Sequence, residues 1–544
     1  MSAGAGTTDT TQKTPRALEP DAAADGGSDR SRWLALYVLC LGMLMIVLDV
    51  TIVNVALPSI QEDLHFSTSS LAWVVNAYLI AFGGLLLLAG RLGDLIGRRR
   101  IFLAGVALFT SASLLCGVAQ TAWWLVAARF VQGVGGAMTS AVILGMIVTM
   151  FTDAREQAKA IGVFAFVASA GGSVGLLAGG VLTQSINWHW IFFVNLPIGI
   201  ATALAARRLV PDERGIGLRE GADVPGAVLI TSALMLGVYT IVGPAAKQGW
   251  GSAGTLLFGA GSIVLLVSFL ARERRAASPL MPLRIFRSRP IAAANAIQIL
   301  SVAGMFGMFF LGALYLRRVL GYDALEIGLA FLPVTIAMGT LSIRYSERIY
   351  MVLGARRALL AGLTLVLAGL VVFALAPVHA DYTTEVAPSM LLLGLGAGTA
   401  FPALMNLAMS GATPQDAGLA SGLVSTTAQV GGALGLAVLA TLSTSRSDAL
   451  KASGHPIASA LTSGYHLAFW VAAGLVGCAL AVVLAAVEPG RAPALTHDAA
   501  PAHPYAEADA DRQGHPQRVA HADGVCVGGR RERMMKRING DVNA

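Results

Sequence analysis

The sequence predicts an all-α polytopic membrane protein, and three observations lead to this fold class. The chain of 544 residues is 55% hydrophobic and only 13% charged, whereas soluble domains carry about 25% charged residues. Its apolar runs are about 20 residues long, the length that an α-helix needs to cross a bilayer. They lack the alternation of a membrane β-barrel. The third observation is an internal repeat, which predicts two helical bundles.

Fourteen apolar runs are candidate transmembrane helices. The stretches before and after them, 1–32 and 488–544, are polar and show no apolar periodicity, so we expect both to be disordered. The expected limits of the spans are 33–57, 71–90, 101–119, 122–149, 159–183, 189–209, 223–243, 253–270, 291–316, 325–345, 357–376, 386–409, 418–442 and 465–487.

The basic residues indicate the orientation of the spans. Loops after even-numbered spans hold 20 Lys and Arg residues, and loops after odd-numbered spans hold 5. Cytoplasmic loops carry the excess of basic residues, so we expect both termini in the cytoplasm and a location in the inner (plasma) membrane. The net charge of +7 is therefore a topology signal and not a nucleic-acid-binding patch.

Two parts of the chain resemble each other. Residues 95–105 match residues 352–362, and Gly133-Val-Gly135 matches Gly394-Leu-Gly396, at an offset of about 260 residues. Spans 1–6 thus correspond to spans 9–14, which is how many secondary transporters are built. The predicted order is a cytoplasmic leader (1–32), a six-helix bundle (33–210), two inserted helices with loops (211–290), a second six-helix bundle (291–487) and a cytoplasmic tail (488–544).

Asp49 is the only acid in the apolar run 33–57. A carboxylate at membrane depth costs about 2.5–3.5 kcal/mol on insertion scales, so an acid there indicates a water-filled cavity, a partner charge or a travelling proton. We therefore predict that Asp49 has a function in transport.

Arg129 is a second charged residue at membrane depth, in span 4. At 1.5 Å per residue it lies about 10 Å below the outer surface, and Asp49 lies about 24 Å above the inner one. In a core of about 30 Å these depths nearly coincide, so a direct or water-relayed pair is geometrically allowed. Snorkelling to the interface is the alternative explanation for Arg129.

Neutral polar and small residues within the spans are further candidates. Polar side chains that could line a substrate cavity are Asn54, Asn76, Tyr78 and Gln132. Small residues at three- and four-residue spacing let helices approach closely, and in span 5 we expect this role for Gly171, Gly172, Gly175, Gly179 and Gly180.

The loop Gly90-Arg-Leu-Gly-Asp-Leu-Ile-Gly-Arg-Arg-Arg100 resembles the loop 2–3 signature of the major facilitator superfamily. This resemblance implies that Asp94 and Arg98, with Gly90 and Gly97, form a cytoplasmic gate that is shut in the outward-facing state. Residues 128–137 resemble the span 4 signature of that superfamily, in which the arginine is linked to proton transfer. This role falls on Arg129.

Three more stretches are similar to the fourteen-span drug:H+ antiporter branch (EmrB/QacA-like) of that superfamily. They are Leu48–Pro58, Trp188–Gly199 and the span 5 stretch Ser169–Gly180. The Gly-Pro pair usual in span 5 is absent here. The resemblance implies the major facilitator fold, and an antiporter that works by alternating access.

We therefore expect a proton-driven efflux transporter for amphiphilic drugs or antibiotics. The high ratio of Arg to Lys is typical of GC-rich bacteria, which fits self-resistance in an antibiotic producer. The alternative is a proton-coupled symporter for a nutrient or metabolite. We expect no enzymatic activity, no nucleotide-binding motif, no metal site and no cofactor besides the proton gradient. The expected partners are the substrate, protons and lipid, and the expected state is a monomer.

Overall fold

The computed structural model describes residues 22–151, 153–212, 215, 217, 221–276, 279–412 and 417–488, and these residues fold into helices joined by short loops. The elements are α1 (Ala22–Asp63), α2 (Thr68–Ile96), α3 (Arg98–Gly117), α4 (Ala122–Met150), α5 (Ala154–Ser185), α6 (Trp190–Phe193), α7 (Asn195–Leu209), α8 (Val224–Thr240), η2 (Ile241–Ala245), α9 (Ala246–Gln248), α10 (Ala253–Glu273), η3 (Leu283–Arg287), α11 (Arg289–Arg318), α12 (Ala324–Thr340), η4 (Leu341–Tyr345), α13 (Ser346–Ala374), η5 (Tyr382–Val386), α14 (Ala387–Ser410), α15 (Ala417–Ala452) and α16 (Ile457–Ala486).

Each predicted span falls on a helix or on consecutive helical segments, which confirms the all-α polytopic class. Within the described residues, twelve helices are long and apolar enough to cross a membrane. Val174–Ser185 in α5 and Ala324–Thr340 are shorter apolar helices. α1 begins at Ala22, within the predicted leader. The rest of the leader and residues 489–544 of the tail lie outside the described residues.

Polar caps set where several helices begin. The Ser67 hydroxyl accepts from the Ser70 amide at the start of α2, and Ser252 accepts from the Thr255 amide at the start of α10. At α12, the Asp323 carboxylate accepts from the Glu326 amide at 2.8 Å. The Glu326 side chain accepts in return from the Asp323 amide. Such caps satisfy amide groups that have no partner within the helix.

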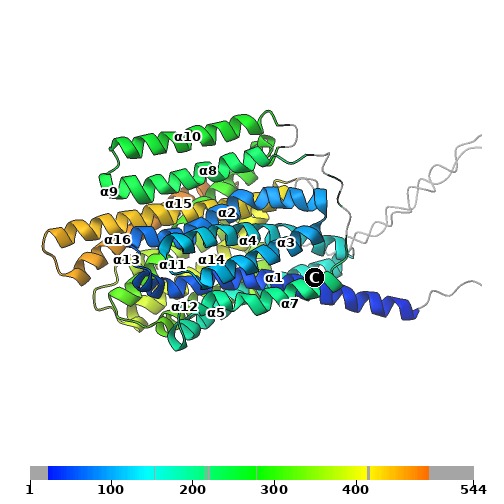
Figure 1. Ribbon diagram of the computed structural model, residues 1–544, viewed down its shortest axis with the longest axis horizontal. Helices are drawn as coiled ribbons and strands as arrows, with labels where there is room; N and C mark the ends of the chain where they lie inside the picture. The colour runs from blue at the N-terminus through cyan, green and yellow to red at the C-terminus, as the bar shows by residue number, and fades with distance from the viewer. Residues whose placement is uncertain are drawn as a thin grey trace, which may run out of the picture. The chain divides into compact units, whose positions relative to one another are not determined.

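The helices pack mainly within two groups, α1–α7 and α11–α16. In the first group α1 packs on α5 and α7, while α4 packs on α2 and α3. In the second group α11 packs on α15 and α16, and α13 packs on α14 and α16. The groups meet where α2 packs along α15 and α5 packs along α12. Figure 1 shows these helices running side by side.

The inserted hairpin α8–α10 covers one of the two seams between the groups. α8 packs on α2, and its continuation η2 packs on α15, where Thr441 Oγ1 donates to the Ile241 carbonyl at 3.4 Å. α10 contacts α8 and lies beyond it at the upper edge in Figure 1. The side chains of Leu256 and Leu257 on α10 are 62% and 70% exposed. Large apolar side chains exposed along a helix are expected where lipid is the solvent.

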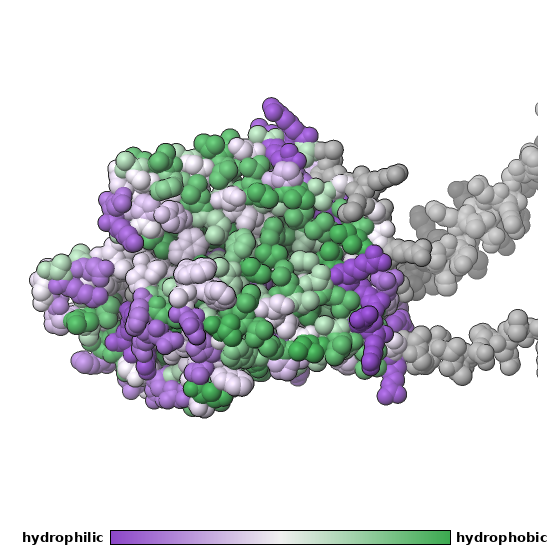
Figure 2. Space-filling view, in the orientation of Figure 1, coloured by the Kyte–Doolittle hydropathy of each residue, from purple (hydrophilic) through white to green (hydrophobic). Residues whose placement is uncertain are grey.

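Figure 2 shows the same polarity over one face of the molecule. Hydrophobic residues cover its middle, and hydrophilic residues gather at both ends of the helices. This distribution is the one that a bilayer imposes, because charged groups favour its two aqueous faces. The chain is therefore a multi-pass membrane protein.

We predict that the turn between α9 and α10 lies outside the cell. A Gln248→Cys variant, with only the buried Cys40 and Cys116 retained, should react in intact cells with a membrane-impermeant maleimide, because Gln248 is exposed. Arg275→Cys is the control at the opposite end of the hairpin. It should react only after the cells are opened, and labelling of Arg275→Cys alone in intact cells would contradict the topology.

Candidate functional site

The structure places Asp49 of α1 against Arg129 of α4. The distance from Arg129 Nη1 to Asp49 Oδ2 is 2.5 Å, and the side chains of Arg129 and Asp49 are 1% and 0% exposed. The contact agrees with the similar depths expected for Asp49 and Arg129 from the rise of a helix. Arg129 does not snorkel to the interface, because its side chain is buried against Asp49. Removing one partner of a buried pair leaves an uncompensated charge, which typically costs about 3–5 kcal/mol.

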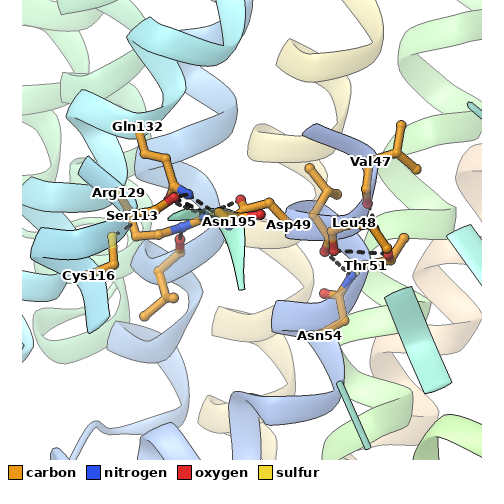
Figure 3. A network of polar contacts seen from close by, with 12 residues as sticks. Val47, Leu48, Asp49, Thr51, Asn54, Ser113, Cys116, Arg129, Gln132 and Asn195 are labelled. Carbon is orange, nitrogen blue, oxygen red and sulfur yellow. Dashed lines mark hydrogen bonds and ion pairs between the residues drawn. The ribbon is translucent and has the colours of Figure 1, made fainter. Parts of the chain in front are cut away.

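The Asp49 carboxylate accepts hydrogen bonds on both oxygens (Figure 3). Oδ2 accepts from Arg129 Nη1. Oδ1 accepts from Gln132 Nε2 at 2.7 Å and from Asn195 Nδ2 at 3.2 Å. The two amides also donate to Ser113 Oγ, at 2.7 Å and 3.3 Å respectively. In these contacts both carboxylate oxygens therefore face N–H donors.

Arg129 has further partners that do not depend on Asp49. Its Nε donates to the Val74 carbonyl of α2 at 3.0 Å. Its guanidinium carbon lies 4.4 Å from the ring centre of Tyr78 and 5.8 Å from that of Phe192. A cation over an aromatic face is stabilised by the ring quadrupole, more strongly where water is excluded. The positive charge can therefore remain buried when its pair with Asp49 opens.

Glycine in α4 explains why Arg129 reaches the backbone of α2. A Cβ on Gly133 would lie 2.4 Å from the Tyr78 carbonyl oxygen, so the two helices approach more closely than a larger residue permits. Arg129 and Val74 lie one helical turn earlier on their helices. The close approach thus brings the guanidinium to the Val74 carbonyl.

Two members of this network were not predicted from the sequence. They are Ser113 of α3 and Asn195 of α7, and both are 0% exposed. The structure joins Gln132 to Asp49, and its predicted role in lining a substrate cavity stays a prediction. Cys116 Sγ lies 3.6 Å from Gln132 Oε1 and completes the cluster. Asn195 carries a signal, since it is an amide within an apolar run. Ser113 carries none, because small hydroxyl residues are common in membrane helices.

The other cavity candidates are placed as follows. Asn54 Nδ2 donates to the Val50 carbonyl of its own helix at 3.0 Å. Asn76 is 0% exposed, and neither its Oδ1 nor its Nδ2 has a hydrogen-bond partner among the described residues. Tyr78 is 1% exposed and lies beside Arg129. Their role in substrate binding stays a prediction.

The candidate gate residues lie at the junction of α2 and α3. Arg98 Nη2 is 3.0 Å from Asp94 Oδ1, and Arg98 Nη1 donates to the Gly145 carbonyl of α4 at 3.3 Å. Gly97 has a φ of 114°, which a residue with a side chain rarely adopts. A Cβ on Gly90 would lie 3.9 Å from the Ala141 side chain, an ordinary contact. The loop is thus tied to α4.

The five glycines of α5 face two different helices. Those that face α1 are Gly171, Gly175 and Gly179, where an added Cβ would meet atoms of Leu44, Thr51 and Ile52. Those that face α12 are Gly172 and Gly180; at Gly180 an added Cβ would lie 2.9 Å from the Ala324 oxygen and from the Leu325 Cα. The glycines therefore allow α5 to pack closely on α1 on one side and on α12 on the other.

A bundle of membrane-spanning helices around a fully buried acid–base pair is typical of secondary transport proteins. Residues 39–436 match the sequence profile of the Major Facilitator Superfamily. The chain belongs to this family.

Three relatives of 37% identity are named for antibiotic resistance or export. The puromycin resistance protein pur8 of Streptomyces alboniger is 37% identical over 469 residues, which are 85% of this chain and 92% of that protein. The cephamycin export protein CmcT of Amycolatopsis lactamdurans is 37% identical over 470 residues, covering 86% and 94%. The lincomycin resistance protein of Streptomyces lincolnensis is 37% identical over 425 residues, covering 78% and 87%.

A solved structure has the same fold. It is a bacterial homolog of the human lysosomal transporter Spinster, in an inward-facing and unoccupied conformation, with a TM-score of 0.61 and 17% identity. The match covers 84% of this chain and 97% of that one.

Proposed function

We propose that this protein exports amphiphilic antibiotics across the cytoplasmic membrane in exchange for protons. The observation that carries the proposal is the buried Asp49–Arg129 pair. Ionisable residues within membrane spans are costly and rare, and they usually have a function in transport. The relatives support the substrate class, since their names refer to resistance to or export of antibiotics.

Asp49 is the residue that takes up and releases the coupling proton. When it is ionised, Arg129 Nη1 and two amides hold it. Protonation removes its charge and weakens the pair, while Val74 and the aromatic rings retain Arg129. The two protonation states therefore favour different arrangements of α1 and α4, which is how a proton shifts a conformational equilibrium.

The helix groups α1–α7 and α11–α16 are the two bundles that rock during alternating access, and α8–α10 is an insertion between them. The outer ends of α1 and α11 are joined by an ion pair, with Arg317 Nε 3.5 Å from Glu62 Oε1. We place both termini in the cytoplasm, on the evidence of the loop charges. The protein acts as a monomer.

The direction of transport tests the proposal. Inside-out vesicles that contain the protein should accumulate puromycin or lincomycin when their lumen is acidified, and a protonophore should abolish the accumulation. Vesicles with the Asp49→Asn variant are the control. Drug efflux down an imposed proton gradient would instead support the alternative, a symporter.

We predict that Asp94 acts on the conformational equilibrium and not on the proton. Asp94→Asn should slow export severalfold, because it weakens the link through Arg98 to α4, while drug binding in detergent should change less than about twofold. Arg100→Gln alters an exposed charge of the same loop and should export normally. Loss of drug binding in Asp94→Asn without a slower transport step would argue against this role.

A further inference from the structure

The groups that contact the Asp49 carboxylate are hydrogen-bond donors, so none of them can accept a hydrogen bond from a protonated Asp49. Oδ2 faces Arg129 Nη1, and Oδ1 faces two N–H donors, on Gln132 and Asn195. A protonated carboxyl group needs an acceptor for its own O–H, and a donor cannot serve as one. None of these three donors can accept that O–H, whereas an amide that turned over would present its oxygen to it.

The Gln132 amide is placed to make this change. Its Nε2 donates to Asp49 Oδ1 and to Ser113 Oγ, both at 2.7 Å. Its Oε1 accepts from Arg129 Nη1 at 2.6 Å and from Cys116 Sγ. One planar group thus contacts both members of the ion pair, with opposite hydrogen-bonding character at its two ends.

We propose that the Gln132 amide turns over when Asp49 is protonated, and that this rotation couples proton uptake to the release of Arg129. The inference rests on the proposed proton exchange. A proton from the outer water forms an O–H bond with Asp49 Oδ1, and no other covalent bond changes. The turned amide presents Oε1 to this O–H and presents Nε2 to Arg129. Because Nε2 and Nη1 are both donors, the guanidinium loses its contact with the amide. Its bond to Asp49 Oδ2 weakens, because the carboxyl group no longer carries a charge. Release of the proton toward the cytoplasm reverses each step.

Two features of the site lower the free-energy cost of the rotation. The last torsion of a glutamine side chain is broad and roughly two-fold, so the turned amide occupies the same volume. Ser113 Oγ accepts from Nε2 in the present arrangement and can donate to Oε1 in the turned one, since a hydroxyl does both. Neither state leaves Ser113 without a partner.

Asn195 is the matched comparison within the same site. Its amide also donates to Asp49 Oδ1 and Ser113 Oγ, but at longer distances of 3.2 Å and 3.3 Å. Within the part of the chain that the structure describes, its own Oδ1 is buried without a partner, so a rotation of Asn195 would break no bond to Arg129. Asn195 can therefore hold the carboxylate but cannot transmit its protonation to the guanidinium. Gln132 contacts both residues and is therefore the positioning residue that can transmit the protonation of Asp49 to Arg129.

Cys116 gives a readout of the amide that needs no drug. In the described part of the chain, the charged or titratable side chains that surround Asp49 are Arg129 of α4, Tyr78 of α2 and Cys116 of α3. The Cys116 S–H points to Gln132 Oε1 and would face an N–H donor after rotation. Loss of its acceptor should move the S–H stretching band to higher frequency.

The experiment is infrared spectroscopy of the purified full chain, in a variant that keeps Cys116 as its only cysteine. As pH is lowered, a C=O band of protonated Asp49 should appear, identified by its absence in Asp49→Asn. We expect the S–H band to shift over the same pH range. In Gln132→Met the S–H band should stay constant with pH, and in Asn195→Ala it should shift as in the parent. If Gln132→Met does not fold, Gln132→Asn asks the same question, because its amide is one methylene too short to bridge both partners.

Each outcome decides the proposal. The proposal is overturned if the S–H band keeps its frequency while the C=O band of Asp49 appears. It is also overturned if the shift of the S–H band is lost in Asn195→Ala. A merely structural Gln132 would alter thermal stability in Gln132→Met but leave the pH-dependent shift in place. Since no drug is added, a failure of the proposed export would show separately, as absent drug flux with an intact S–H shift.

Discussion

Asp49→Asn should still fold and reach the membrane, with reduced stability, but lose uphill drug export, with accumulation in vesicles falling to the level without protein. Asparagine has nearly the size of aspartate but carries no titratable proton. It also removes the counter-charge of Arg129, while the Val74 carbonyl and the Tyr78 ring still hold the guanidinium. The variant should therefore resemble the protonated state permanently. Drug uptake into acidified inside-out vesicles measures this effect.

Asp63→Asn is the matched control for this prediction. Asp63 is the last residue of the same helix and accepts from Trp188 Nε1 at 3.0 Å, a bond that asparagine can keep. It should export at the parent rate. If Asp49→Asn kept parent-level resistance and drug-driven proton release, Asp49 would not be the residue that carries the coupling proton.

Arg129→Ala should have the second large effect, on both stability and export. It leaves the Asp49 carboxylate buried without its cation, which costs about 3–5 kcal/mol if the group stays ionised. The protein avoids this cost by keeping the proton on Asp49, so proton release to the cytoplasm becomes the limiting step. Export should fail at neutral internal pH and recover in part as internal pH is raised. Transport measured against internal pH tests this.

Two further variants separate charge from shape at this position. Arg129→Lys should export better than Arg129→Ala and worse than the parent, because lysine keeps the charge but not the planar fork that reaches both Asp49 and Val74. The double variant Asp49→Asn/Arg129→Ala should be more stable than Arg129→Ala at high pH, since it contains no unpaired charge. Identical pH profiles for the parent, Lys and Ala forms would show that Arg129 is a packing residue.

The membrane spans and the two charged residues could be predicted from the sequence because each depends on a large local free energy. A run of about 20 apolar residues is strongly favoured in a bilayer, so the spans are visible without tertiary information. A buried charge is strongly disfavoured, so Asp49 and Arg129 stand out as single residues. Their similar depth followed from the rise of a helix and the direction of each span.

Only the tertiary structure decided which neutral groups complete the site. Gln132 and Asn195 are amides within apolar runs, a weaker signal than a charge, and Ser113 carries no signal. Asn195 comes from a helix 146 residues beyond Asp49 in the chain, and Arg129 from one 80 residues beyond it. Their meeting depends on helix rotation and spacing, which close contacts such as that of Gly133 with the Tyr78 carbonyl set. Such contacts depend on the packing of several helices at once, so the sequence of one helix does not determine them.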